Sequence, residues 1–170
     1  MLYVPESLTI TNLFNHSIKG PPMRIALASD HAGYDLKQHL LKYVAEKGHD
    51  AIDLGVNSAE HLTDYPDAAQ TISAAILDGR AERGILICGS GVGASIAANK
   101  IKGIYAAICH DTYSAAQGVE HDNMNVLCLG GRIIGVATAE QLTSAFVGAS
   151  FRSEVDRYQR RFDKVLKMEE

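Results

Sequence analysis

The sequence has no tryptophan, few prolines and no apolar run long enough to cross a membrane. Its first residues lack the basic start and unbroken apolar stretch of a secretory signal. Lysine and arginine number 16 against 20 aspartates and glutamates, which gives a net charge of −4 at pH 7. A basic cluster occurs only near the C-terminus, so we expect neither a nucleic acid nor a membrane surface as a partner.

Cysteine is also scarce, and each of the three residues lies inside an apolar run: Cys88, Cys109 and Cys128. Their odd number and the missing secretory signal favour free thiols in a reducing cytoplasm. The sequence has no close ligand pair such as HxxxH or CxxC, so we expect no metal and no cofactor. A metal site would have to combine scattered residues: Asp30, His31, Cys88, His110 and His121.

The length suits one domain that buries a core without disulfides or metals. Regular apolar patterning begins only at Met23, directly after a Gly-Pro-Pro sequence. We therefore expect residues 1–22 to be a disordered or non-native extension, with Met23 as the natural start. Residues 23–170 would form the single domain.

From Met23 onward, short apolar runs alternate with segments of helical periodicity, which is typical of parallel strands joined by crossover helices. Several runs are apolar throughout, as strands covered on both faces are. The predicted strands are 24–30, 50–55, 84–89, 105–111 and 125–130. The predicted helices include 36–44, 68–76, 97–98, 114–120, 138–147 and 155–168.

Polar residues interrupt the apolar runs where the predicted strands end. Asp30 and His31 follow the first strand, and Cys88 comes at the end of the third. Because ligands bind at the carboxyl ends of strands in an open parallel sheet, we expect the functional site there. His121 and Asp122 instead precede the fifth strand, so topology places them at the opposite edge. Only a long loop or a neighbouring subunit would bring them to the same site.

The third predicted strand runs into a glycine-rich loop and a small-residue helix, GILICGSGVGASIAANK at 84–100. The glycines Gly89, Gly91 and Gly93 free backbone N–H groups to converge on an anion at a helix N-terminus. The loop lacks the lysine of a P-loop, and no acidic residue is placed to bind the ribose of NAD, so nucleotide binding is weakly supported. The anion is either a phosphate or an oxyanion that forms only during a reaction.

Cys88 lies at the mouth of this loop. A thiol at a helix N-terminus loses its proton more readily and can act as a base or nucleophile, whereas the alternative is a small buried hydrophobe. We interpret Cys109 and Cys128 in the second way. Arg157 and Arg161, one helical turn apart, form either a fork for a phosphate or a solvated basic face.

One tyrosine and three histidines have no function that the sequence alone can assign. Tyr65, in the sequence TDYP, is either a site residue or a turn aromatic packed on its proline. His39, His49 and His61 occur in polar surroundings, so we expect them to be solvated.

Four blocks resemble the signature blocks of the B-type ribose-5-phosphate isomerases, a family that includes galactose-6-phosphate isomerase subunits. They are SDHAGY at 29–34, TDYP at 63–66, ICGSGVGASIAANK at 87–100 and HDNMNVLCLGGR at 121–132. The resemblance extends in order from Met23 to about Val165. It implies a Rossmann-like α/β/α sandwich with a five-stranded parallel sheet and a C-terminal helix packed on a partner subunit. It also implies a metal-free isomerase of a sugar phosphate, a homodimer or dimer of dimers with shared active sites.

The resemblance assigns a role to each candidate residue. Cys88 matches the base that moves a proton between C2 and C1 through a cis-enediolate, and Ser90 matches the hydroxyl that shuttles protons between O1 and O2. His121 matches the histidine that helps to open the sugar ring. The backbone N–H groups of the loop would stabilise the enediolate: Gly89, Gly91 and Gly93. The sugar hydroxyls would contact Asp30, Tyr65 and Asp122, and the phosphate would contact His31, Arg132, Arg157 and Arg161.

The chain departs from the family pattern in two places. The sequence His-Asp-Asn at 121–123 replaces the more frequent His-Asn-Asp, so a sugar contact comes either from Asp122 or from the amide one residue later. The C-terminal segment lacks the glycines expected just before the arginines, so Arg160 is an alternative to Arg157 or Arg161.

We therefore expect interconversion of ribose 5-phosphate and ribulose 5-phosphate. One alternative is a six-carbon substrate, allose 6-phosphate or galactose 6-phosphate. Galactose-6-phosphate isomerases need two unlike subunits, and the presence of both Cys88 and His121 in one chain favours the pentose enzyme. The alternative of another class is a non-catalytic, flavodoxin-like module that binds a phosphosugar or nucleotide.

Overall fold

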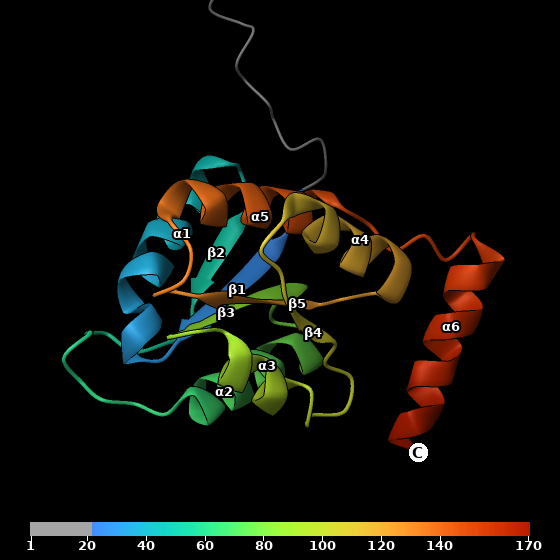
Figure 1. Ribbon diagram of the computed structural model, residues 1–170, viewed down its shortest axis with the longest axis horizontal. Helices are drawn as coiled ribbons and strands as arrows, with labels where there is room; N and C mark the ends of the chain where they lie inside the picture. The colour runs from blue at the N-terminus through green and yellow to red at the C-terminus, as the bar shows by residue number, and fades with distance from the viewer. Residues whose placement is uncertain (1–21) are drawn as a thin grey trace, which may run out of the picture.

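The computed structural model describes residues 22–170, so the extension expected over 1–22 lies, apart from Pro22, outside the described residues (Figure 1). Within this part of the chain, five parallel strands form one sheet between two layers of helices, which confirms the predicted α/β fold. The strands are β1 (Arg24–Ser29), β2 (Asp50–Asp53), β3 (Arg83–Cys88), β4 (Ala106–Ile108) and β5 (Val126–Gly130). The helices are α1 (Tyr34–Glu46), α2 (Tyr65–Leu77), α3 (Val92–Ala98), α4 (Thr112–Asp122), α5 (Val136–Gly148) and α6 (Asp156–Leu166), with short 3₁₀ helices η2 (His31–Gly33) and η3 (Lys167–Glu169).

The strand order, β2-β1-β3-β5-β4, decides where a ligand can enter the sheet. After β1 the chain crosses to one side to form β2, and after β2 it crosses to the other side to form β3. The helices that follow β1 and β3 therefore leave on opposite faces, which opens a crevice between the carboxyl ends of these two strands. The register aligns Ser29 with Ile87, so Asp30 and Cys88 leave the sheet side by side.

Apolar side chains of different size cover the two faces of the sheet. Helices α1, α4 and α5 bury large side chains such as Leu40 and Phe146 on one face. Helices α2 and α3 cover the other face mainly with alanine, for example Ala69 and Ala94, which brings both helices close to the strands. No helix within residues 22–170 is long and apolar enough to span a membrane.

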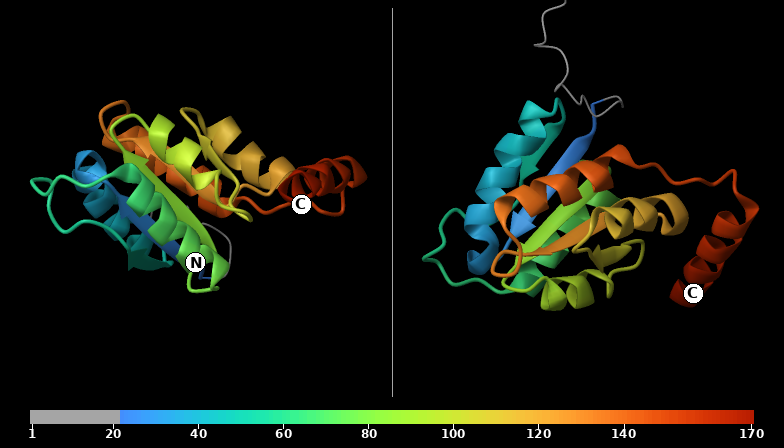
Figure 2. Two further views of the ribbon diagram at one scale, coloured as in Figure 1. Left: turned by 90° about the horizontal axis from the view of Figure 1, so that it is seen from below. Right: turned by 45° about the horizontal axis from the view of Figure 1, so that its top comes forward.

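Helix α6 lies at the edge of the molecule, beyond α4, and does not cover the sheet (Figure 2). The segment between α5 and α6 is held at its start by Arg83, whose guanidinium donates to the carbonyl oxygen of Ala149 at 2.6 Å. Tyr158 and Phe162 of α6 are buried, and the ring of Phe162 meets Tyr105 edge to face at 5.0 Å. In the single chain α6 thus contacts its own α4 and the start of β4, and packing on a partner subunit stays a prediction.

Strand β4 is shorter than the predicted strand at 105–111. The side chain of Asn99 bonds both the N–H and the carbonyl of Ala106, at 2.9 and 2.7 Å, and the Asn125 carboxamide accepts from the N–H of Tyr105. At this edge of the sheet, side-chain amides therefore take the place of some of the backbone hydrogen bonds that a longer β4 would make with a neighbouring strand. Beyond the strand, the carboxylate of Asp111 caps helix α4 by accepting from the N–H of Ser114, which ends the extended conformation.

The prediction that His49 is solvated is wrong. Its side chain is 8% exposed at the amino end of β1, and its Nδ1 accepts from the N–H of Met23 at 3.2 Å. The residues on either side of His49, Gly48 and Asp50, are exposed, whereas His49 itself lies against the start of β1 in the turn that precedes β2. Burial lowers the pKa of His49 below 6.5.

This burial predicts a pH dependence of stability. Because the pKa of His49 is lower in the folded state, its contribution is complete above 6.5 and is lost as the pH falls from 6.5 toward the folded value. Urea unfolding at pH 7.5 and 5.5 measures the free energy of unfolding. His49→Gln should flatten its decline by up to about 1.4 kcal/mol per pH unit, and the exposed-site control His61→Gln should not. An unchanged slope in His49→Gln would contradict the assignment.

Candidate active site

A cavity of about 340 Å³ opens at the carboxyl ends of β1 and β3, at the crevice that the strand order creates. It is lined by Asp30, Tyr65, Cys88, Gly89, Ser90, Gly93, Arg132 and Ile133. All of these except Ile133 are residues that the sequence analysis proposed for the site. Segments far apart in the chain therefore meet at the edge of the sheet where a ligand was expected.

The thiol of Cys88 lies in a turn made by the glycine loop. Cys88 ends β3, and its Sγ accepts from the N–H of Gly91 at 3.1 Å. Gly91 has a φ of 82°, in the left-handed region, and an added Cβ would also lie 3.2 Å from the carbonyl carbon of Leu129. Only glycine makes this turn without strain, and the turn aims a backbone N–H at the sulfur atom.

Tyr65 forms a wall of the cavity. It is the first residue of α2, and a Cβ added to Gly93 would lie only 2.7 Å from its Cζ atom. The tyrosine ring therefore rests against the backbone of the loop, at a distance that only glycine allows. Ser90, between the thiol and the start of α3, has an exposed hydroxyl that accepts from the N–H of Val92 at 3.3 Å. Tyr65 thus lines the cavity, and its role in binding a ligand stays a prediction.

Asp30 and His31 both follow β1, but only Asp30 lines the cavity. Asp30 is buried, lines the cavity and accepts from the N–H groups of Ala32 and Gly33 at 2.9 and 3.1 Å, which caps η2. The Nδ1 of His31 lies 3.2 Å from the carbonyl oxygen of Thr63, two residues before Tyr65. His31 thus contacts the segment that carries Tyr65 and does not itself line the cavity.

Arg132 supplies the positive charge at the cavity. The turn after β5 is tied to the glycine loop, because Gly131 N–H donates to the Cys88 carbonyl at 2.8 Å and Arg132 N–H donates to the Gly89 carbonyl at 3.1 Å. The guanidinium of Arg132 lies beside Gly89, 3.8 Å from the position of an added Cβ. Its side chain is exposed and free to approach an anionic ligand.

The other four candidate residues do not line this cavity. The His121 ring stacks on Tyr158 of α6, with centroids 3.9 Å apart and planes inclined by 19°, and Arg157 donates to the Tyr158 hydroxyl at 2.7 Å. Arg161 is exposed on the same helix. Asp122 lines a different cavity of about 290 Å³, together with Tyr105. Within one chain these residues form a separate group on α4 and α6, as the topology predicts for His121.

Sequence reasoning missed two residues of these groups. Ile133 is 58% exposed at the cavity, although its sequence context does not distinguish it from a core isoleucine. Tyr158 is buried against His121, and its spacing of four residues from Phe162 gave a signal of a buried helix face.

The other two cysteines do not take part in the site. Burial raises the pKa of Cys109 to about 11, with a smaller contribution from Asp111, and burial raises the pKa of Cys128 further still. Both thiols therefore keep their protons near neutral pH, which supports their interpretation as small core residues. Within residues 22–170, no group of three or more His, Cys, Asp or Glu side chains is arranged to hold a metal ion.

Comparison with known proteins places this arrangement in a family. Residues 25–165 match the ribose/galactose isomerase family. Ribose-5-phosphate isomerase B of Escherichia coli is 40% identical over 147 residues, which cover 86% of this chain and 97% of the relative. The D-erythrulose-4-phosphate isomerase of Pectobacterium atrosepticum is 42% identical over 129 residues, 76% of this chain and 85% of the relative.

The fold leads to the same family. The solved structure of Clostridium thermocellum ribose-5-phosphate isomerase B superposes with a TM-score of 0.82 at 38% sequence identity. The match covers 86% of this chain and 97% of that chain, so the two proteins share nearly all of the described domain. The chain belongs to the ribose/galactose isomerase family, the family of sugar-phosphate isomerases that includes these relatives.

Proposed function

We propose that this protein interconverts ribose 5-phosphate and ribulose 5-phosphate, with Cys88 as the base. The observation that carries the proposal is the position of the Cys88 thiol in a cavity whose loop N–H groups, Asp30 carboxylate and Arg132 guanidinium surround one small volume. A base beside several N–H donors suits a reaction that removes a carbon-bound proton and creates an oxyanion.

The proposed reaction needs no oxidant or reductant. The Cys88 thiolate removes the proton from C2 of the open-chain aldose, and the C–H electron pair forms the C1–C2 double bond of a cis-enediolate while the C1 carbonyl oxygen gains the negative charge. The N–H groups of Gly89 and Gly93 stabilise this charge on O1, which is absent from O1 of the substrate, while the N–H of Gly91 stays with the Cys88 sulfur. Ser90 transfers a proton from O2 to O1, and the Cys88 thiol returns its proton to C1 to give the ketose.

The rest of the substrate is assigned to the polar residues around the thiol. Asp30 and Tyr65 face the cavity where the sugar hydroxyls would lie, and the exposed guanidinium of Arg132 is available for the phosphate. We assign His31, Arg157 and Arg161 to the phosphate as well, and His121 to opening of the sugar ring. The last three need a second copy of the chain, because they lie on α4 and α6 away from the cavity.

Exposed apolar side chains beside the cavity support a homodimer. Val92 and Ile96, one turn apart on α3, are 52% and 59% exposed, and Ile133 and Val136 are exposed on the neighbouring turn after β5. Apolar side chains grouped in this way around a site are typical of an interface between subunits. In a two-fold dimer each copy would offer its α4 and α6 residues to the cavity of the other, which completes both sites.

Substrate length is the first prediction of this proposal. We expect kcat/KM to be highest for ribose 5-phosphate. Allose 6-phosphate and erythrulose 4-phosphate, which lengthen or shorten the sugar by one carbon, should each lose about 10-fold or more, because a pocket discriminates one carbon by about 1–3 kcal/mol. A coupled assay on the three phosphates measures the order. Binding of all three without turnover would instead identify a non-catalytic module.

The second prediction concerns the base. Cys88→Ala should lower kcat for ribose 5-phosphate by at least about 100-fold, the usual contribution of a positioned base, while circular dichroism and phosphosugar binding stay unchanged. Cys109→Ala is the matched control and should keep full activity, because its buried thiol stays protonated. Iodoacetamide should inactivate the wild type through Cys88 alone. Turnover by Cys88→Ala at the wild-type rate would exclude the thiol as the base.

The third prediction tests the shared site by complementation. Cys88→Ala and the double variant His121→Ala/Arg161→Ala should each be inactive as homodimers. When they are unfolded together and refolded, half of the dimers should be mixed, and one of the two sites in each mixed dimer should be intact. About a quarter of wild-type activity should return. Native mass spectrometry measures the mixed dimers, and their formation without any recovered activity would refute site sharing.

A further inference from the structure

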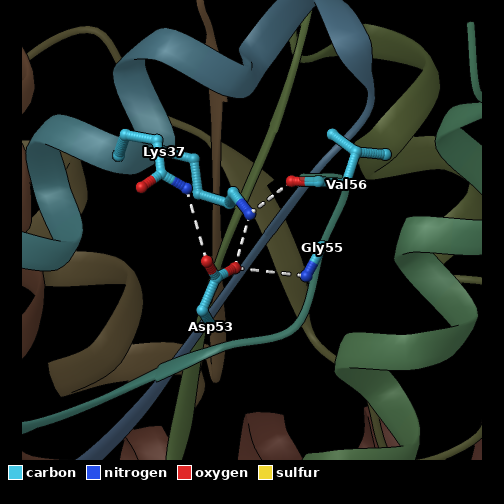
Figure 3. A network of polar contacts seen from close by, with 5 residues as sticks. Lys37, Asp53, Gly55 and Val56 are labelled. Atoms are coloured by element: carbon cyan, nitrogen blue, oxygen red, sulfur yellow. Dashed lines mark hydrogen bonds and ion pairs between the residues drawn. The ribbon is translucent and has the colours of Figure 1, made fainter. Parts of the chain in front are cut away.

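Lys37 is a fully buried cation on a helix face whose other buried residues include Leu40 and Val44. Lysine is almost never buried completely unless it is paired, because removing the ammonium group from water is costly. Its Nζ contacts the carboxylate of Asp53 and donates to the carbonyl oxygen of Val56 at 3.0 Å (Figure 3). An apolar side chain at this position would avoid the cost of burial, so the charge indicates a role beyond core packing.

Both partners of Lys37 lie at the start of the segment 54–64, which connects β2 with α2. Asp53 is the last residue of β2, and its Oδ1 also accepts from the N–H of Gly55 at 3.3 Å (Figure 3). The backbone of residues 55–63 has no hydrogen bond to the backbone of another described residue. The N–H of Leu54 still donates to the carbonyl oxygen of Leu27 at 2.9 Å. Beyond Leu54 the path of the segment depends on side-chain contacts, and those of Lys37 come first.

The other end of the segment leads into the cavity. The carbonyl oxygen of Thr63 lies 3.2 Å from the Nδ1 of His31, and two residues later the ring of Tyr65 rests against Gly93. The segment is thus fixed near 53–56 and again at Thr63. Between these points it connects the buried ammonium group of α1 to a wall of the cavity.

We propose that Lys37 is a positioning residue: its contacts with Asp53 and Val56 set the path of segment 54–64 and, through it, the place of Tyr65 in the cavity. This inference rests on the proposed function. Tyr65 is assigned to sugar hydroxyls that do not change during the isomerisation, so it binds the substrate and the transition state about equally. Displacement of its ring therefore raises KM and leaves kcat nearly unchanged.

The test begins with Lys37→Met, which keeps the apolar stem and removes the charge. The Asp53 carboxylate left behind is 39% exposed and can be solvated, so the variant retains no buried unpaired charge. KM for ribose 5-phosphate should rise about 10-fold, with kcat within about 2-fold of the wild type. Arg80→Met is the matched control, because it removes an exposed cation paired with Asp78 far from the segment. An unchanged KM in Lys37→Met overturns the proposal.

A double variant shows whether Lys37 acts through Tyr65. In a Tyr65→Ala background, Lys37→Met should cause no further rise in KM, because the ring that it positions is absent. If the two effects on KM multiply instead, Lys37 acts by another route and the proposal is overturned. A loss of stability alone would not produce the expected dependence on Tyr65.

Hydrogen exchange gives a readout that does not require activity. The hydrogen-bonded amides of Leu54, Gly55 and Thr63 should exchange faster in Lys37→Met than in the wild type or Arg80→Met, and equal exchange at these three amides overturns the proposal. If Lys37→Met does not fold, Lys37→Leu, which also leaves no buried charge, takes its place in both measurements, with the same expected results. A wild type that converts no sugar phosphate would refute the proposed function, whereas the exchange experiment would still decide the role of Lys37.

Discussion

The parallel pairing of β1 with β3 is the constraint on which the candidate site depends. It aligns Ser29 with Ile87, so the chain leaves the two strands at adjacent points, with Asp30 on one side and Cys88 on the other. The strand order sends the following helices to opposite faces, and the crevice between them stays open. The glycine loop continues directly from Cys88, and two distant segments complete the cavity: the first residue of α2, Tyr65, and the turn after β5 with Arg132.

Close approach of backbone to neighbouring groups then determines the chemistry of this crevice. The left-handed turn at Gly91 aims an N–H at the Cys88 sulfur, and the missing side chain of Gly93 lets the Tyr65 ring lie against the loop. All three thiols are buried, but Cys88 lines the cavity, whereas Cys109 and Cys128 do not, and burial raises the pKa values of those two. The strand end on which a thiol lies thus decides whether it faces the cavity.

The polar groups form two sets that one chain does not bring together. The first surrounds the cavity, and the second, around His121 and Tyr158, lies on α4 and α6. Helix α6 begins after a segment that is held by Arg83 at Ala149, and its buried residues include Tyr158. Because the second set lies away from the cavity within one chain, the proposed shared site requires a second copy of the chain.

The α/β class, the approximate strands and most residues of the cavity follow from local patterns in the sequence. Apolar runs, helical periodicity and a glycine loop are local patterns, and the rule for the carboxyl ends of parallel strands converts them into a location for Asp30, Cys88 and Ser90. Motif resemblance added Tyr65 and Arg132, whose roles no local pattern specifies. The topology of the chain also placed His121 correctly, away from the cavity.

Only the tertiary structure decided the features that depend on contacts between distant segments. The strand order, the burial of His49, the short β4 and the exposure of Ile133 all arise where one segment meets another. Lys37 is the clearest case, because in the sequence it is one more lysine of an amphipathic helix. Its burial becomes evident only when Asp53 and Val56, from the next strand and loop, close over the ammonium group. A local pattern records which residues are apolar, whereas the partners of a buried polar group are set by the fold.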